Sequence, residues 1–170
     1  DPAVDRGRQR ATWLAEKLAQ AGVTVVSGLA KGVDRAAHEG ALAAGGKTAA
    51  VIGTPLNKAY PIENAELQEQ IYKEHLLVSP FAEGEAVYKS NFPARNRVMA
   101  AVSDGTVIIE ASDTSGTLHQ AAECTRLQRW LFISQAIVDD PNIKWPAKFL
   151  SYKRAVVLTH VSDITERIKR

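Results

Sequence analysis

Several features that mark particular protein classes are scarce in this 170-residue sequence. Its single cysteine, Cys124, excludes an internal disulfide and fits a reducing, cytoplasmic compartment. No apolar run approaches the length of a membrane-spanning helix, so we expect no membrane association. The four histidines show no metal-ligand spacing, and we expect neither a metal nor a cofactor. Membrane proteins, disulfide scaffolds and metalloenzymes are therefore poor descriptions of this chain.

An excess of one charge is also missing. The formal net charge is only +2, from 21 Lys and Arg against 19 Asp and Glu. Binding to nucleic acid would therefore need a local basic patch, because the bulk charge does not supply it. With 45% hydrophobic and 24% charged residues, the composition is that of a globular protein, and the length fits one domain over residues 1–170.

Apolar patterns of strand and helix type alternate along the chain. We expect strands at 23–26, 48–52, 76–79, 106–110, 130–134 and 155–158, and helices at 4–21, 33–44, 64–73, 94–102 and 117–128. Residues 136–153 are expected to be irregular, and Ser162-Asp163 to cap a terminal helix. This alternation predicts an α/β fold of the Rossmann-like, doubly wound kind. Its mostly parallel sheet should have at least five strands and helices on both faces.

The stretch 25–38 reads as a strand end, a turn and a helix start. Gly28 and Gly32 permit backbone conformations that a Cβ would block, and Ser27 and Lys31 add a hydroxyl and a cation. Backbone N–H groups at such a helix start attract anions, phosphate above all. An ordinary tight turn without a ligand has the same spacing, and that alternative stays open.

A second turn of this type follows a strand that ends near Glu110. Ser115-Gly116-Thr117 opens the next helix with two hydroxyls and a glycine. Ligands of open α/β sheets collect beyond the carboxyl ends of the strands, where the three segments 27–32, 53–60 and 110–117 are expected to lie. Two hydroxyl-and-glycine turns that face one crevice suit a sugar–phosphate backbone. Glu110, at the strand end itself, suits a ribose hydroxyl or an arginine partner.

The segment 89–97 concentrates positive charge. Lys89, Arg95 and Arg97 stand near Asn91 and Phe92, and arginine binds phosphate while phenylalanine stacks on bases. On a helix, the two arginines would point about 200° apart, so one is expected to pair elsewhere. Phe92 precedes a proline, which predicts an extended backbone and a ring at the crevice rim. A solvated helix start with structural ion pairs is the alternative.

Catalytic groupings are weak. We find no nucleophile–base pair, and we expect His38 to be a partly buried, satisfied imidazole and Cys124 a buried, inert thiol. Glu123 lies two turns into its expected helix and is read as structural.

Taken in series, the motifs resemble those of the DprA/Smf family of DNA-processing proteins over about residues 20–134. The matching stretches are Ser27-Gly28-Leu29-Ala30-Lys31-Gly32-Val33-Asp34, Ala37-His38, Gly40-Ala41-Leu42, Gly46-Lys47-Thr48, Ala50-Val51-Ile52-Gly53, Tyr60-Pro61, Glu63-Asn64, Asn91-Phe92-Pro93, Arg95-Asn96-Arg97, Val107-Ile108-Ile109-Glu110-Ala111 and Ser115-Gly116-Thr117-Leu118.

The resemblance implies a bacterial, non-enzymatic protein that binds single-stranded DNA, protects it and assists RecA loading in natural transformation and recombination. It also implies a homodimer. Carried over by motif, the DNA-binding residues are Ser27, Gly28, Lys31, Gly32, Asn91, Phe92, Arg95, Arg97, Ser115, Gly116 and Thr117.

The sequence departs from the family pattern in three places. Lys31 stands where the family usually has arginine, which keeps the charge and loses the planar fork. The family's first strand is expected before residue 1. After Ile133 the pattern gives way to 141–146, which bears on the expected dimer and recombinase surfaces.

Two alternative functions of the wider superfamily stay open. One is a nucleotide-binding sensor that uses the same crevice. The other is a nucleotide phosphoribohydrolase, although Ser115-Gly116-Thr117 matches only part of the turn that marks those enzymes, and Glu123 is set too far along.

Overall fold

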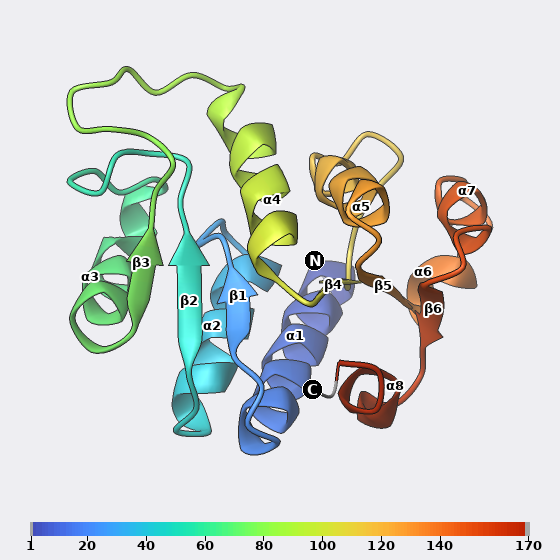
Figure 1. The fold of residues 1–170 in the computed structure, drawn as a ribbon. Helices are drawn as coiled ribbons and strands as arrows, with labels where there is room; N and C mark the ends of the chain where they lie inside the picture. Colours follow the sequence, from blue (N-terminus) through green and yellow to red (C-terminus); the bar gives the residue numbers. More distant parts are fainter. Residues whose placement is uncertain (1, 169–170) are drawn as a thin grey trace.

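The computed structural model describes residues 2–168, in which strands and helices alternate (Figure 1). The strands are β1 (Val25–Ser27), β2 (Thr48–Val51), β3 (Leu76–Val78), β4 (Gly105–Ile108), β5 (Trp130–Ser134) and β6 (Ala155–Leu158). The helices are α1 (Pro2–Gln20), α2 (Val33–Ala43), the 3-10 turn η1 (Ile62–Asn64), α3 (Ala65–Glu74), α4 (Asn91–Val102), α5 (Thr117–Arg126), α6 (Gln135–Val138), α7 (Pro146–Leu150) and α8 (Val161–Thr165). No helix in residues 2–168 is long and apolar enough to cross a membrane.

Every strand pairing within residues 2–168 is parallel, but the strands form two sheets of three. The first sheet has the order β1-β2-β3, with Val25 opposite Thr48, and the second has the order β4-β5-β6, with Gly105 opposite Trp130. The predicted α/β, doubly wound architecture is confirmed. The prediction of one sheet with at least five strands is wrong for the described residues, because no strand among them joins β1 to β4.

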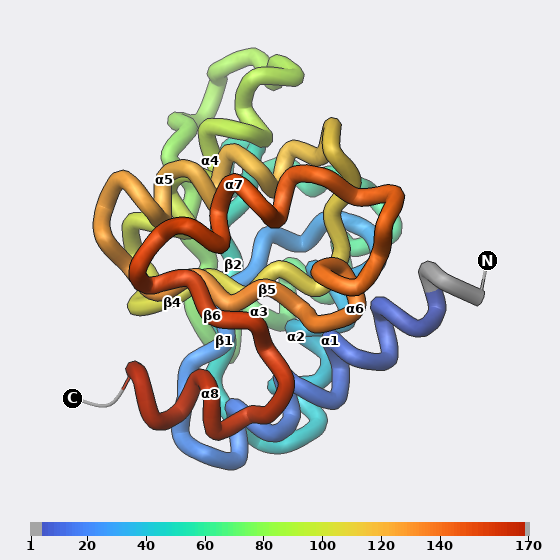
Figure 2. The backbone as a smooth tube through the Cα atoms, turned by 90° about the vertical axis from the view of Figure 1, so that its right-hand side faces the viewer, coloured from blue at the N-terminus to red at the C-terminus, as the bar shows by residue number. Residues whose placement is uncertain are grey.

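Helices lie on both faces of the sheets. α1 and α2 lie behind the strands in the view of Figure 1, and α4 and α5 lie in front. Figure 2 shows α7 on one side of the second sheet and α8 on the other, next to α1. Two cores result. One joins α1, α2 and Phe132, and the other joins α5 to Leu131 and Phe149.

Small residues bring α1 close to α2. An apolar stripe on α1 faces the core through Leu14, Ala15 and Leu18, at helical spacing. A Cβ on Gly40 of α2 would lie 2.3 Å from the backbone oxygen of Thr12. Glycine is therefore required at that position for the two helices to approach this closely.

The structure corrects several predicted details. α4 begins at Asn91, three residues earlier than predicted, so Phe92 lies in its first turn and not in an extended segment. Proline is tolerated in a first turn, where the N–H groups have no intrahelical partner, and this outweighs the pre-proline bias. Residues 136–153 were predicted to be irregular, but they contain most of α6 and all of α7. Asp163 accepts a hydrogen bond from the backbone N–H of His160, so it caps α8 from inside the helix.

Candidate nucleic-acid interface

The loop between β1 and α2 is fixed from within. Leu29 is buried and adopts a left-handed backbone conformation with φ of +63°, which is unusual for a non-glycine residue. The side-chain amide of Asn64 holds it by donating a hydrogen bond to the Leu29 carbonyl over 2.7 Å. Gly32 closes the loop with φ of +83°. The loop is therefore preorganised and needs no ligand to adopt its shape.

Ser27 and Asp34 tie this loop to α2. The Ser27 hydroxyl is buried and donates to the Asp34 carbonyl over 3.2 Å, while the Asp34 carboxylate accepts from the Ala30 N–H over 3.3 Å. Ser27 thus serves the loop and not a ligand in this arrangement. The amino end of α2 still lies at the carboxyl edge of the first sheet, where its dipole favours an anion.

Arg95 is a structural cation at the centre of the site. Its side chain is buried and donates hydrogen bonds to the carbonyl of Gly28 over 2.5 Å and to that of Val51 over 3.1 Å. Burial lowers the pKa of its guanidinium, and the carboxylate of Asp34 opposes that shift. A Cβ on Gly28 would stand 2.5 Å from the guanidinium. Glycine at position 28 therefore leaves the space that the Arg95 side chain occupies at the end of β1.

The remaining predicted cations are on the surface. Lys31 is exposed and its ammonium lies 3.2 Å from Glu63 in a solvent-accessible pair. Lys89 and Arg97 are exposed as well. The pKa of Glu123 on α5 is lowered, first by its hydrogen bonds with Arg126 and to a smaller extent by the charge of Arg97. Arg97 therefore faces α5 while Arg95 faces the strands. This agrees with the expectation that the two arginines point to different sides of the helix.

A pocket of about 440 Å³ opens beside Lys31. The aromatic rings of Tyr60 and Phe92 line it with their centroids 5.5 Å apart, and Arg95 lies 5.7 Å from the centre of the Phe92 ring. Phe92 is half-buried against Gly53, whose Cβ position would be 2.7 Å from the ring. The ring therefore lines the pocket wall as part of α4.

Asn91 anchors α4 next to this pocket. Its buried side-chain amide donates to the Gly53 carbonyl over 3.0 Å, so it has a structural role at the helix start.

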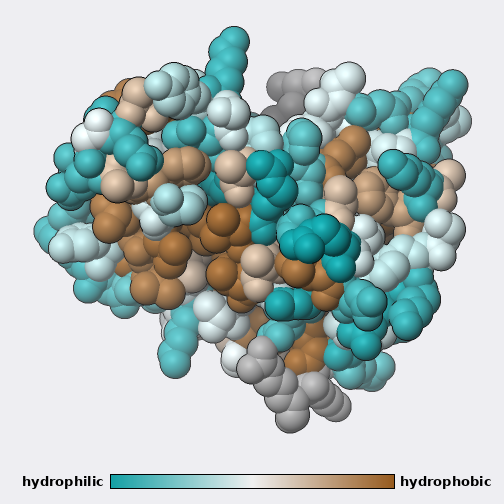
Figure 3. Space-filling view, turned by 45° about the horizontal axis from the view of Figure 1, so that its top comes forward, coloured by the Kyte–Doolittle hydropathy of each residue, from teal (hydrophilic) through white to brown (hydrophobic). Residues whose placement is uncertain are grey.

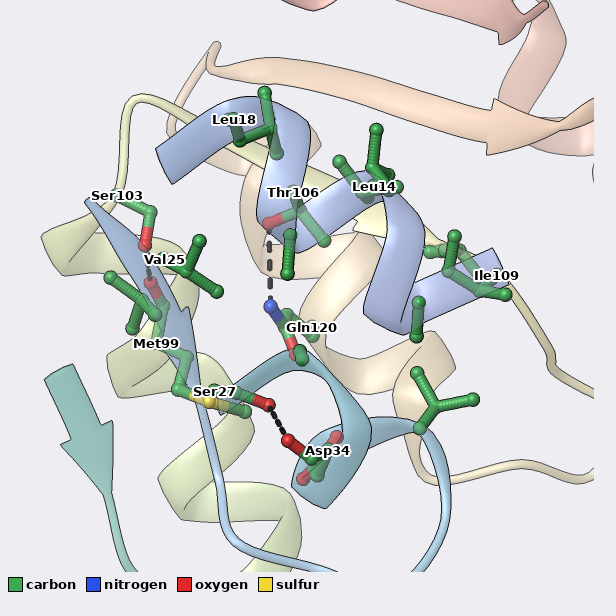
Figure 4. A pocket seen from close by; sticks show the side chains of 18 of the residues that line it. Leu14, Leu18, Val25, Ser27, Asp34, Met99, Ser103, Thr106, Ile109 and Gln120 are labelled. Atoms are coloured by element: carbon green, nitrogen blue, oxygen red, sulfur yellow. Dashed lines mark hydrogen bonds between the residues drawn. The ribbon is translucent and has the colours of Figure 1, made fainter. Parts of the chain in front are cut away.

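The second predicted turn faces a larger cavity of about 1290 Å³, which Ser27, Lys31, Gly32 and Arg95 also line. Ser115, Gly116 and Thr117 stand at its edge, and the Asn96 side chain donates to the Gly116 carbonyl over 3.2 Å. Figure 4 shows the interior of this cavity, with side chains from α1, β1, α4, β4 and α5 directed into it. The two predicted turns therefore meet at one cavity.

The groups considered for catalysis have other roles. His38 was expected to be partly buried and satisfied, which is wrong. It is completely buried, with Nδ1 2.6 Å from the Thr48 hydroxyl, and its Nε2 has no hydrogen-bond partner among the described residues. Burial lowers the pKa of His38 to about 4. Burial raises the pKa of the Cys124 thiol to about 11, which confirms a buried thiol that stays protonated. Glu110 packs over Gly7, and its pKa is raised by burial against the opposing charges of Arg10 and Arg8.

Tyr60 was not among the predicted site residues. Its side chain is 66% exposed and adjoins Phe92 across the pocket. The sequence places Tyr60 in one of the three segments expected at strand ends, 53–60, but it gave no role to the ring itself.

The family model described as DNA recombination-mediator protein A matches residues 2–169. The chain belongs to this family. The matched region includes both predicted turns and α4, which meet at one cavity.

Relatives from several bacteria are similar to parts of the chain. The Bacillus subtilis DNA processing protein DprA is 30% identical over 95% of this chain and 54% of its own length. The Synechocystis protein Smf is 39% identical over 82% of this chain and 34% of its own length. DprA from Streptococcus pneumoniae is 50% identical over 56% of this chain and 34% of its own length. The chain therefore spans between a third and about half of these relatives.

Two solved DprA structures share the fold. The S. pneumoniae protein has a TM-score of 0.85 at 34% identity, covering 97% of this chain and 58% of that one. The Helicobacter pylori protein, described for its single-stranded DNA binding mode, has a TM-score of 0.81 at 27% identity, covering 95% of this chain and 73% of that one. The Rossmann-like character of the fold is confirmed by these likenesses.

Proposed function

We propose that this chain binds single-stranded DNA at the carboxyl ends of its strands. Exposed Lys31, Lys89 and Arg97 neutralise phosphates, and the rings of Tyr60 and Phe92 receive a base. The observation that carries this proposal is the pocket where this aromatic pair stands beside Lys31 and the loop that opens α2. The single-stranded DNA binding described for the similar H. pylori protein supports it.

We further propose that Gly28, Gly32, Ser27, Asn91 and Arg95 shape this site and that Ser115, Gly116 and Thr117 extend it along the strand. Ser27, Asn91 and Arg95 have their polar atoms engaged with backbone carbonyls, which supports a shaping role. Ser115 and Thr117 are half-exposed at the cavity edge, where their hydroxyls can donate to phosphate.

A mediator role without catalysis fits the family. We propose that the bound strand is protected and passed to a RecA-type recombinase, and that the protein acts as a homodimer in the cytoplasm. The engagement of Glu123 with Arg126 and the raised pKa of Cys124 support binding over hydrolysis.

Competition separates this proposal from its two alternatives. A fluorescent oligo(dT) is bound to the protein and challenged with unlabelled oligo(dT) or with free thymidine monophosphate at equal phosphate concentration. We expect displacement by the oligonucleotide alone. Equal displacement by the mononucleotide would favour a nucleotide sensor. Release of free base from nucleoside monophosphates, followed by chromatography, would favour the phosphoribohydrolase.

A further inference from the structure

A second basic surface lies on helix α1, outside the site described above. Arg6, Arg10, Trp13 and Lys17 are all exposed and follow one another at intervals of four, three and four residues. At 3.6 residues per turn, this spacing places them within an arc of about 60° on one side of the helix. These four residues, called the α1 face, form a stripe separate from the buried stripe that packs on the core.

The cations of the α1 face are not neutralised by neighbouring carboxylates. Among the described residues, no carboxylate lies within ion-pair distance of Arg6, Arg10 or Lys17, whereas the neighbouring Arg8 pairs with Asp5. The three cations are spread over about 16 Å of the helix axis. A row of this kind favours an extended polyanion over a single small anion.

Trp13 stands between these cations with its side chain open to solvent. It is 53% exposed, which is unusual for the largest hydrophobic side chain. Within the part of the chain that the structure describes, no aromatic ring or cation stacks on it. An open indole beside cations suits a nucleobase, because every base has a face that can stack on it.

The α1 face begins beside the proposed DNA site. Arg8 lines the 1290 Å³ cavity together with Lys31 and Gly32, and Glu110 packs over Gly7 just past the end of β4. The amino end of α1 therefore lies at the carboxyl edge of the strands, and the helix leads away from that edge (Figure 1). Figure 2 shows α1 at the margin of the fold, with its amino end directed outward.

We infer that the α1 face is a second contact surface for single-stranded DNA, which follows the strand after it leaves the carboxyl-end site. Arg6, Arg10 and Lys17 contact phosphates, and Trp13 stacks on a base. The inference rests on the proposed function, since it requires a strand already bound beside Lys31. An acidic polypeptide matches the charges of this face but makes no use of the open indole, and this favours the nucleic acid.

Oligonucleotides of two lengths separate the two surfaces. An oligo(dT) of about six nucleotides fills the carboxyl-end site alone, and one of about twenty also reaches α1. The test variant combines Arg10→Gln with Lys17→Gln. The matched control, the α7 pair, combines Lys144→Gln with Lys148→Gln, exposed residues just before and within α7, which lies on the other side of the second sheet.

The long strand should respond to the α1 variant alone. We expect the α1 variant to weaken its binding at least about tenfold at about 0.1 M salt and to flatten its log–log salt slope by about 1.4, because two phosphate contacts are lost. The α7 pair should change neither quantity. The short strand should bind equally to both variants and to the wild type, which also shows that the variants are folded.

Trp13→Ala tests the stacking contact by itself. It should weaken binding of the long strand at least about fivefold without altering the salt slope, and it should leave binding of the short strand unchanged. Tyr72→Ala, which removes an exposed ring on α3, should affect neither strand.

Unchanged binding of the long strand to the α1 variant would overturn the inference and leave the proposed function standing. Equal losses in the α1 variant and the α7 pair would also overturn it, because they would indicate bulk charge. If poly-glutamate displaced the long strand as well as unlabelled oligo(dT) at equal charge, the face would be one for acidic polypeptides and the inference would be wrong. A wild type that fails to bind the short strand would contradict the proposed function itself, and the inference would be overturned with it.

Discussion

The guanidinium of Arg95 donates a hydrogen bond to the Gly28 carbonyl over 2.5 Å, across 67 positions of sequence. The same nitrogen donates to the Val51 carbonyl, so one buried cation joins the ends of β1 and β2 to α4. Arginine near a DNA site is usually expected to face the phosphates. Here Arg95 fixes the backbone at the ends of β1 and β2, next to Lys31 and Phe92.

Arg95→Met should therefore affect stability first. The substitution leaves the carbonyls of Gly28 and Val51 buried without their donor, at a cost of about 3 kcal/mol in the free energy of unfolding. For a chain of this size, the thermal midpoint should fall by roughly 6–12 °C. Calorimetry measures it.

Arg97→Met is the matched control, two residues along the same helix but exposed. It should change the free energy of unfolding by less than about 0.5 kcal/mol while weakening oligonucleotide binding. A stability loss that is equal in the two variants would contradict the assigned roles.

Gly28→Ala should be destabilising for a steric reason. Its Cβ would lie 2.5 Å from the Arg95 guanidinium and 2.8 Å from the Asp34 carboxylate, and we expect a loss of about 1–3 kcal/mol in chemical denaturation. Gly116→Ala is the comparison within the same site, since its nearest neighbour would be 3.9 Å away and its φ of −61° suits alanine. It should be nearly neutral. If Gly116→Ala were the more damaging change, the packing argument would be wrong.

The buried imidazole of His38 should make the stability of the fold depend on pH. Its pKa is lowered from 6.5 to about 4 by burial, so between these values the unfolded chain binds a proton that the folded chain excludes. Stability is thus fully present above about pH 7 and declines as the pH falls toward 4, by about 2 kcal/mol between pH 7 and pH 5. Urea unfolding of the wild type and of His38→Gln at both pH values tests this. A pH dependence that survives unchanged in the variant would assign it to other groups.

Alanine substitutions at Tyr60 and Tyr72 distinguish base stacking from a general effect of losing an exposed aromatic ring. Both side chains are largely exposed, at 66% and 61%, but only Tyr60 lies beside Phe92. Tyr60→Ala should weaken oligonucleotide binding by about 1–3 kcal/mol without altering its salt dependence, because stacking releases no counterions. Tyr72→Ala should leave binding unchanged. Fluorescence anisotropy titrations at two salt concentrations measure both effects, and equal losses would argue against a stacking role.

Exposed apolar surface gathers over the first sheet. Figure 3, which brings the carboxyl-end side forward, shows brown surface gathered over the half that contains β1, β2 and β3. Leu76 on β3 and Val102 at the end of α4 are among the exposed apolar residues.

The sequence predicted best what depends on local pattern. All six strands were anticipated because β-branched runs alternate with helical stripes, and the two turns at strand ends were located correctly. Short helices such as α7 were missed, since Trp145 and Phe149 are placed by the core and not by helix propensity.

Tertiary contacts decided the rest. Nothing in the spacing tells which of Arg95 and Arg97 is buried, because that depends on the Gly28 carbonyl, far away in the sequence. Phe92 was expected in an extended segment, but the Asn91 bond to Gly53 starts the helix before it. The role assigned to Tyr60 depends on its contact with the ring of Phe92, which lies more than 30 residues away in the sequence.

The central claim is that single-stranded DNA binds at the carboxyl ends of the strands, and the salt dependence of Lys31→Ala tests it most directly. Lys47 is the matched control, an exposed lysine just before the amino end of β2, at the opposite edge of the sheet. With three exposed cations in the site, the log–log salt slope of the wild type should be roughly −2, at about −0.7 for each phosphate contact. Lys31→Ala should weaken oligo(dT) binding and flatten the slope by about 0.7, whereas Lys47→Ala should change neither. An unchanged slope for Lys31→Ala, or an equal flattening for Lys47→Ala, would contradict the account.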